Sequence, residues 1–165
     1  KRSALVAMHA ALREGGMRKL YTLLVLGAVR ERRREVAVPL EKYLLPGGDR
    51  RVKVGDRGLE SRTVFTLLGA AGEYTLLQAE LLTGRTHQIR VHAAHIGHPI
   101  AGDEKYGDFA ANKALARRGL KRMFLHATRL ELAHPGSGQP LVLEAPLPPE
   151  LETFVARLVK AAVDE

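Results

Sequence analysis

Residues 82–92 concentrate the side chains that could do chemistry. Their sequence is Leu-Thr-Gly-Arg-Thr-His-Gln-Ile-Arg-Val-His, in which a glycine turn separates an apolar strand pattern from a helical one. A helix N-terminus directs backbone N–H groups and a positive dipole end toward a bound group. Arg85 and Arg90 add two guanidinium groups that suit a carboxylate or a phosphate. The segment predicts an anion or carboxylate site; the alternative is a junction whose arginines bond only nearby carbonyls.

Four of the seven histidines lie close together, at His87, His92, His95 and His98. Zinc-binding helices of the zincin type use histidines four residues apart with a glutamate between them. This cluster has spacings of five, three and three and contains no glutamate, and the chain has no cysteine. We therefore expect structural or RNA-contacting histidines here, and a metal-dependent hydrolase is the weaker alternative.

Other polar candidates lie outside this segment. Asp103 is the aspartate placed most like a site residue, because it follows the arginine pair closely in the sequence. We favour a turn-forming role for it, in which its carboxylate accepts backbone hydrogen bonds. Tyr21 lies near Lys19 in a β-leaning stretch and, taken alone, indicates a half-buried strand aromatic.

The charge of the chain indicates a polyanionic partner. The 165 residues carry a formal net charge of +8, and residues 1–60 hold 14 Lys and Arg against 7 Asp and Glu. Basic runs at 30–34, 50–53 and 117–122 predict phosphate contacts, with solvated loops or helix faces as the alternative. Aromatic residues make up only 5% of the chain, which disfavours an extended base-stacking surface. With no membrane-length apolar run and no signal-peptide pattern, we expect a cytoplasmic protein.

The hydrophobic pattern predicts one α+β domain with a mixed, largely antiparallel sheet and flanking helices. Strands are expected where apolar residues alternate, and helices where they recur every three to four positions. The expected strands are 19–29, with a bulge at Gly27, then 61–68, 74–82, 124–133 and 141–145. The expected helices are 3–13, 86–97, 109–118 capped by Asp108, and 150–163. Strands 61–68 and 74–82 should form an antiparallel hairpin.

Several short motifs follow one another along the chain in a fixed order. They are Lys19-Leu20-Tyr21, Thr83 to His92, Gly97-His98-Pro99-Ile100, Gly102-Asp103, Tyr106-Gly107, Phe124-Leu125-His126-Ala127, His134-Pro135 and Glu144-Ala145-Pro146. In this combination they resemble the RluA-type pseudouridine synthases, most closely the RluC-type members that modify large-subunit ribosomal RNA. The resemblance implies the pseudouridine synthase catalytic fold, isomerisation of uridine to pseudouridine in RNA, and no metal or organic cofactor.

One departure from the family pattern concerns the catalytic aspartate. In the family it belongs to an Arg-Leu-Asp motif, which is absent from this sequence. We therefore expect residues 1–165 to be a catalytic domain truncated at its N-terminal side, without the aspartate motif and without the family's N-terminal RNA-binding domain. Such a piece should be inactive alone, and no aspartate of this chain should be promoted to the missing role.

The resemblance also implies roles for individual residues. Tyr21 would pack on the uracil, and either Arg85 or Arg90 would pair with the aspartate. Contacts to RNA, or support of the site in the case of His87 and Gln88, are expected from Lys19, Arg32, Arg33, Arg34, His87, Gln88, Arg118 and Lys121. We expect a monomer acting on large-subunit ribosomal RNA, with no membrane partner. A transfer-RNA-modifying member of the family and a non-catalytic RNA-binding module are the alternatives.

Overall fold

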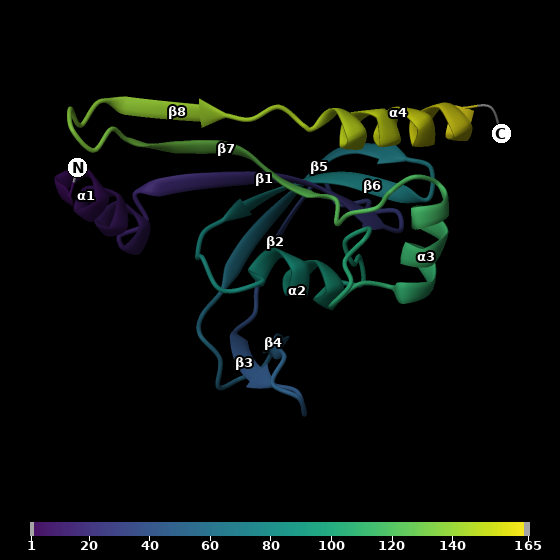
Figure 1. The fold of residues 1–165 in the computed structure, drawn as a ribbon, viewed down its shortest axis with the longest axis horizontal. Coiled ribbons are helices and arrows are strands. Elements are labelled where there is room, and N and C mark those ends of the chain that lie inside the picture. The colour runs from purple at the N-terminus through teal and green to yellow at the C-terminus, as the bar shows by residue number, and fades with distance from the viewer. Residues whose placement is uncertain (1, 164–165) are drawn as a thin grey trace.

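A computed structural model describes residues 2–163 (Figure 1). The elements follow the chain as α1 (Arg2–Arg13), β1 (Met17–Leu26), β2 (Arg33–Ala37), β3 (Leu40–Leu44), β4 (Arg50–Val54), β5 (Arg62–Ala71), β6 (Tyr74–Leu81), α2 (Gln88–His95), α3 (Phe109–Arg117), β7 (Leu125–Ala133), β8 (Pro140–Glu144) and α4 (Pro149–Val163). None of the helices in this range is both long and apolar enough to cross a membrane.

Six strands form one sheet in the order β2-β5-β6-β1-β7-β8, and β3 and β4 form a separate two-stranded sheet. Every pairing between these strands is antiparallel, which confirms the expected α+β class. The expected hairpin is β5–β6, with Ala71 opposite Tyr74 at its turn. The strand that contains Lys19 and Tyr21 therefore lies inside the sheet, with a neighbour on each side.

Helices cover both faces of this sheet, α2 lying below it and α4 above it in Figure 1. Because side chains alternate along a strand, Leu23 and Leu24 of β1 point to opposite faces. Leu23 belongs to the cluster that contains Ile89 of α2, whereas Leu24 packs in the cluster that contains Phe154 of α4. Lys19 and Tyr21 share the face of Leu23, so they lie on the α2 side.

An irregularity in the sheet lies at Tyr21. The register between β1 and β7 shifts between Leu20 and Tyr21, and the Thr128 hydroxyl donates to the Leu20 carbonyl at 3.1 Å. Ala79 and Ala127 are the residues paired with Tyr21 on the two neighbouring strands. The extra residue of this bulge is Thr128 of β7, which lies between the partners of Leu20 and Tyr21. The two small neighbours leave room beside the tyrosine ring.

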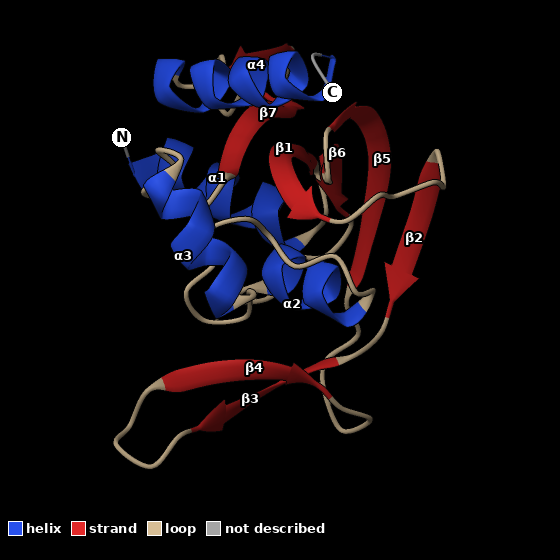
Figure 2. Cartoon of the chain, turned by 90° about the vertical axis from the view of Figure 1, so that its right-hand side faces the viewer, coloured by secondary structure: helices blue, strands red, loops and turns tan. Residues whose placement is uncertain are grey.

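The β3–β4 hairpin projects away from the main sheet (Figure 2). Its apolar side forms a small cluster of its own, in which Leu40 and Val52 pack against Val91 of α2. This cluster is separate from the two larger cores. The hairpin is therefore attached to the domain through few buried side chains.

Several sequence-based boundaries were wrong in detail. The expected first strand ends at Leu26, and Gly27 follows it with φ +85° rather than forming a bulge within it. The expected helix from Thr86 begins at Gln88, because His87 has a left-handed backbone with φ +54°. The short strands β2, β3 and β4 were not predicted. Charged residues hide their alternation, since only Val36 of β2 is buried. The expected Asp108 cap is confirmed: its carboxylate accepts from the Ala111 N–H at 2.9 Å.

Candidate functional site

A cavity of about 760 Å³ lies where β1, α1 and the loop after β6 meet, and both Lys19 and Arg85 line it. An adjoining apolar cavity of about 420 Å³ is lined by Tyr21. The two cavities share Leu12, Met17 and Lys19 as lining residues. Of the predicted site residues, Lys19 thus lines both cavities, Arg85 the larger one and Tyr21 the apolar one.

Gly84 allows the loop to approach the lysine of β1. A β-carbon added at Gly84 would lie 3.2 Å from Lys19 Nζ. A side chain at this position would require the flexible end of Lys19 to shift by a few tenths of an ångström. The loop and the lysine of β1 are therefore in close proximity.

The side chain of Gln88 holds the loop in place. Its Oε1 accepts from the Thr83 hydroxyl at 2.7 Å and from the Arg85 N–H at 3.0 Å. Its Nε2 donates to the Arg62 carbonyl and the Thr63 hydroxyl, both at 2.9 Å. Only 2% of Gln88 is exposed. Of the two roles considered for this residue, burial favours support of the loop over contact with RNA.

Arg85 is exposed, and its guanidinium has no carboxylate within ion-pair distance among residues 2–163. Its Nε donates to the Glu60 carbonyl at 3.0 Å, and this hydrogen bond fixes one edge of the guanidinium group. The residue also lines a groove of about 420 Å³ beside the β3–β4 hairpin. Arg85 therefore lies between the cavity near β1 and the groove near the hairpin, with a charge available for an anionic group.

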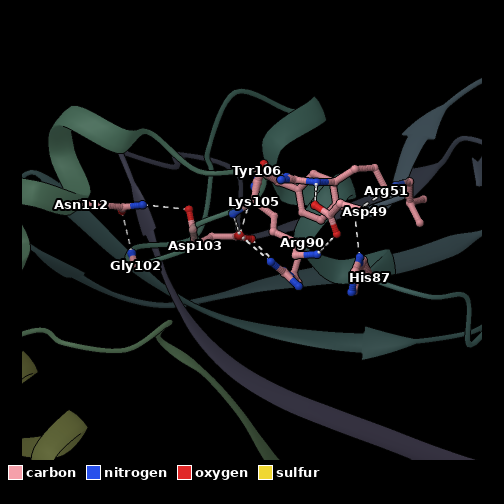
Figure 3. Close-up of polar contacts among 10 residues, drawn as sticks. Asp49, Arg51, His87, Arg90, Gly102, Asp103, Lys105, Tyr106 and Asn112 are labelled. Carbon is pink, nitrogen blue, oxygen red and sulfur yellow. Dashed lines mark hydrogen bonds and ion pairs between the residues drawn. The ribbon is translucent and has the colours of Figure 1, made fainter. Parts of the chain in front are cut away.

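Arg90 forms an ion pair with Asp103 (Figure 3). Its Nε and Nη2 donate to the two carboxylate oxygens at 2.9 and 2.7 Å, a bidentate pair. Asp103 is 1% exposed and the Arg90 side chain 15%. Burial alone would raise the pKa of Asp103, but hydrogen bonds from Arg90 and from two backbone N–H groups hold this pKa below its ordinary value. Arg90 thus serves a buried ion pair of this chain.

Asp103 combines two roles, only one of which the sequence indicated. As expected for a turn aspartate, its Oδ1 accepts from the N–H groups of Lys105 and Tyr106, at 2.9 and 3.1 Å. The buried pairing with Arg90 was not predicted. The turn is tight: a β-carbon at Gly102, whose φ is +80°, would lie 2.4 Å from the Arg122 carbonyl oxygen. The signal that could have indicated the pair is this glycine directly before an aspartate, close to an arginine-bearing helix.

His87 adopts the left-handed conformation at the start of α2, with φ +54°. It is the one non-glycine residue with a positive φ in the part of the chain that the structure describes. Such a conformation costs about 1 to 3 kcal/mol and persists only where the surroundings hold it. His87 Nδ1 lies 2.8 Å from the Tyr106 hydroxyl. Burial, Arg90 and Lys105 together lower the pKa of His87.

The four histidines that lie close together in the sequence have different partners in the structure. His92 is fully buried between the Thr63 hydroxyl, 2.8 Å from Nδ1, and the Val38 carbonyl, 3.0 Å from Nε2. His98 Nδ1 lies 2.8 Å from the Leu26 carbonyl, and His95 is exposed. Within residues 2–163, no three histidine, aspartate or glutamate side chains meet in a metal-binding arrangement.

His92 gives the fold a pH dependence. Burial lowers the pKa of His92 in the folded state, whereas the unfolded chain titrates near its ordinary value of about 6.5. The unfolded state therefore binds more protons below about pH 6.5, so stability is complete above that pH and falls on acidification. We expect urea unfolding between pH 7.5 and 5 to show this loss. The loss should shrink in His92→Gln and persist in His9→Gln, a control at an exposed histidine of α1; an equal loss in both variants would contradict the assignment.

The other predicted RNA contacts lie away from these two cavities. Arg33 and Arg34 begin β2, and Arg33 is paired with Thr66, four residues along β5 from the Arg62 end near the loop. Four strand residues span about 13 Å. Arg118 lies near Glu73 at the β5–β6 turn, the opposite end of β6 from the loop. Lys121 follows α3 and is exposed, as is Arg32 before β2.

Solved structures define the class of this fold. The human RNA pseudouridylate synthase domain containing 1 superposes with a TM-score of 0.76 at 25% identity, over 100% of this chain and 73% of that one. The human domain containing 4 shares the fold at a TM-score of 0.74, 19% identity and coverages of 97% and 69%. The fold is that of a pseudouridylate synthase domain. The sequence pattern of the RNA pseudouridylate synthase family matches residues 1–95, and the chain belongs to this family.

Bacterial relatives are more similar in sequence. Ribosomal large subunit pseudouridine synthase C of Escherichia coli (strain K12) is 43% identical over 163 residues, 98% of this chain and 51% of that protein. The Salmonella typhimurium protein of the same name is 46% identical over 149 residues, 89% of this chain and 47% of that protein. The chain thus spans about half the length of these relatives.

Proposed function

We propose that this chain is part of an enzyme that isomerises uridines to pseudouridines in large-subunit ribosomal RNA. The observation that carries the proposal is that Lys19 lines two adjoining cavities of a pseudouridylate synthase fold, one of them with Arg85 and the other with Tyr21. Relatives named for the large ribosomal subunit support the choice of RNA. The reaction breaks the bond between uracil N1 and the ribose and joins the ribose to uracil C5, whose proton is released.

In this proposal Arg85 pairs with the family's catalytic aspartate, which the 165 residues do not contain. A guanidinium beside a carboxylate keeps the carboxylate ionised at neutral pH. Arg85 is favoured over Arg90 because Nε and Nη2 of Arg90 already donate to the Asp103 carboxylate. Among the described residues no such carboxylate occupies Arg85.

Tyr21 is proposed to stack on the uracil and to help remove the C5 proton. It lies over the apolar cavity, where a flat base could be accommodated, and its ring is half-buried. A uridine inside structured RNA has to turn out of its stack to reach this cavity. Lys19 beside it would hold a flanking phosphate by charge.

Tritium release tests the reaction. Large-subunit ribosomal RNA labelled with tritium at uracil C5 would be incubated with the 165-residue chain and with the same chain extended at its N-terminal side by the family's Arg-Leu-Asp segment. We expect release from the extended protein only. RNA binding without release by the extended protein would support a non-catalytic binding module instead. Release by the 165 residues alone would overturn the role given to the missing aspartate.

The basic run before β2 allows a separate prediction about binding. Changing Arg32, Arg33 and Arg34 together to Ala should weaken RNA binding and flatten its salt dependence. The logarithmic slope should fall by about 0.9 for each arginine that contacts a phosphate. Filter binding at several salt concentrations measures the slope.

A charge-matched control is available on the helices α3 and α4. Lys113, Arg157 and Lys160 are all exposed, and their joint change to Ala removes the same charge. We expect a smaller effect on the slope from this control. An unchanged slope in the arginine variant would show that β2 faces away from the RNA.

We also propose that the enzyme acts as a monomer in the cytoplasm, without a metal or organic cofactor. Analytical ultracentrifugation of the RNA-free protein tests the first point, and full turnover in the presence of a chelator tests the last. A stable dimer, or activity lost to the chelator and restored by a metal, would contradict these statements.

A further inference from the structure

Tyr106 lies where three parts of the molecule meet: the β3–β4 hairpin, the start of α2 and the turn that contains Asp103 (Figure 3). It follows Asp103 in that turn, and its own N–H donates to the Asp103 carboxylate. The family motif includes this tyrosine in sequence, but the function proposed above uses neither its ring nor its hydroxyl.

The hydroxyl of Tyr106 joins the hairpin to the loop before α2. It accepts a hydrogen bond from the Val52 N–H of β4 at 2.9 Å. It also lies 2.8 Å from Nδ1 of His87, toward which it can direct its own proton. A phenol can accept one hydrogen bond and donate another at the same time. The Tyr106 hydroxyl oxygen thus connects the backbone of the hairpin to His87, the residue with the left-handed backbone conformation.

The ring of Tyr106 is in contact with cations from two elements. The guanidinium of Arg51, in β4, lies 5.9 Å from its centroid, and that of Arg90, in α2, lies 5.0 Å away. The imidazole of His87 meets the ring edge to face, with centroids 5.5 Å apart. Cation–π and edge-to-face contacts of this kind favour one mutual orientation of the groups.

The same turn also binds the hairpin through Lys105. The Lys105 ammonium pairs with Asp49 at 2.7 Å, and its carbonyl accepts from Arg51 Nη1 at 2.7 Å. The remaining attachment of the hairpin to α2 is the small cluster around Val52. Two backbone hydrogen bonds, at 3.0 and 2.8 Å, also join Leu40 of β3 to Leu59. Because the apolar cluster is small, the polar contacts with the turn add substantially to this bridge in fixing the hairpin.

The hairpin and the loop share one groove, whose lining includes Lys42 of β3 together with Gly84, Arg85 and Thr86 of the loop. A phosphate backbone lying along this groove would contact both elements at once. Any relative movement of hairpin and loop would therefore change the position of Arg85 with respect to bound RNA.

We propose that Tyr106 is a positioning residue that couples the β3–β4 hairpin to the loop of Arg85 and His87, so that RNA held by the hairpin also fixes the loop. This inference rests on the proposed function for its RNA, but the coupling itself is a property of the folded chain. Tyr106 acts through His87 and Val52 and touches no reacting atom.

Amide hydrogen exchange of the 165-residue chain tests the coupling without requiring catalysis. In Tyr106→Phe the ring remains and the hydroxyl is lost. We expect faster exchange, by about tenfold or more, both at the Val52 N–H and across residues 84–88. Tyr43→Phe is the matched control, since Tyr43 lies on the same hairpin and contacts Lys53 through its ring; it should leave both regions unchanged. Faster exchange at Val52 with no change at 84–88 would overturn the coupling.

A second variant separates the two halves of the connection. His87→Asn keeps a residue type that tolerates the left-handed backbone, but it removes the imidazole that faces Tyr106. We expect faster exchange at 84–88, while Val52 keeps its bond to the tyrosine and its protection. Equal loosening of both regions would mean general destabilisation rather than a directed connection.

RNA supplies the readout that a merely structural role would not change. With a transcript of large-subunit ribosomal RNA, we expect protection of both the hairpin and residues 84–88 in the wild-type chain, but of the hairpin alone in Tyr106→Phe. In the Arg-Leu-Asp-extended enzyme the same change should lower kcat by about tenfold and alter KM by less than threefold. Equal protection of 84–88 in both proteins would overturn the proposal. Absence of RNA protection in either protein would instead contradict the proposed function, and the RNA-free exchange would still decide the coupling.

Discussion

Replacing Arg90 with Met is expected to lower the free energy of unfolding by about 3 to 5 kcal/mol. The change leaves the Asp103 carboxylate, only 1% exposed, without its charged partner. Two backbone N–H groups would still bind that carboxylate. They cannot replace a bidentate guanidinium, because they bring no net charge into the site. Part of the loss should reach the β3–β4 hairpin, since Arg90 also lies against the Tyr106 ring.

Urea unfolding at pH 7.5 measures this effect, and a double-mutant cycle identifies its source. Asp103→Asn removes the buried charge but keeps an oxygen that accepts from the turn, so the double variant should recover part of the stability. Arg129→Gln is the surface control: Arg129 pairs with Glu131 and Glu144 but is 38% exposed, so the loss should stay below about 1 kcal/mol. A loss for Arg90→Met as small as that of the control would contradict the buried ion pair.

Replacing Arg85 with Gln is expected to have the opposite profile, with stability preserved and turnover lost. The side chain is exposed and donates one hydrogen bond, to the Glu60 carbonyl, so the free energy of unfolding should change by no more than about 0.5 kcal/mol. In the enzyme that includes the Arg-Leu-Asp segment, kcat should fall by about 100- to 1000-fold, the range for losing one charged or hydrogen-bonding group at the reacting centre.

Single-turnover tritium release at saturating enzyme measures this loss apart from RNA binding. Arg157→Gln, on the exposed side of α4 and far along the chain from the loop, removes the same charge and should leave the rate unchanged. A fall in RNA affinity that accounts for the whole effect would assign Arg85 to binding rather than to the aspartate.

The sequence predicted the main elements where one periodicity ran long enough. The β5–β6 hairpin, α3 with its Asp108 cap, and α4 were all expected close to their observed bounds. The short strands β2 and β4 were missed because arginines fill exposed positions, and only pairing with a neighbouring strand identifies them as strands.

The sequence indicated which residues belong to the candidate site but not which of them bind one another. The motif indicated that Arg85 and Arg90 matter, yet nothing in one dimension distinguishes an arginine at the mouth of a cavity from one bound to a buried aspartate. The distinction depends on the turn at Gly102, which carries Asp103 back to α2. The contact of Tyr106 with the hairpin could not be predicted either, because it involves β4, a strand that the sequence analysis did not expect.

The central place of β1 in the sheet has a consequence for how the protein is made. β1 pairs with β6 and β7, so Tyr21 meets its neighbours Ala79 and Ala127 only after long chain segments have been added. At roughly 5 to 20 residues per second, about 100 residues of synthesis between β1 and β7 take on the order of 5 to 20 seconds. Contacts this distant in sequence also form slowly. The strand that bears Lys19 and Tyr21 therefore leaves the ribosome well before β7 and waits for its second neighbour, so the cavities around these residues close only when the sheet is nearly whole.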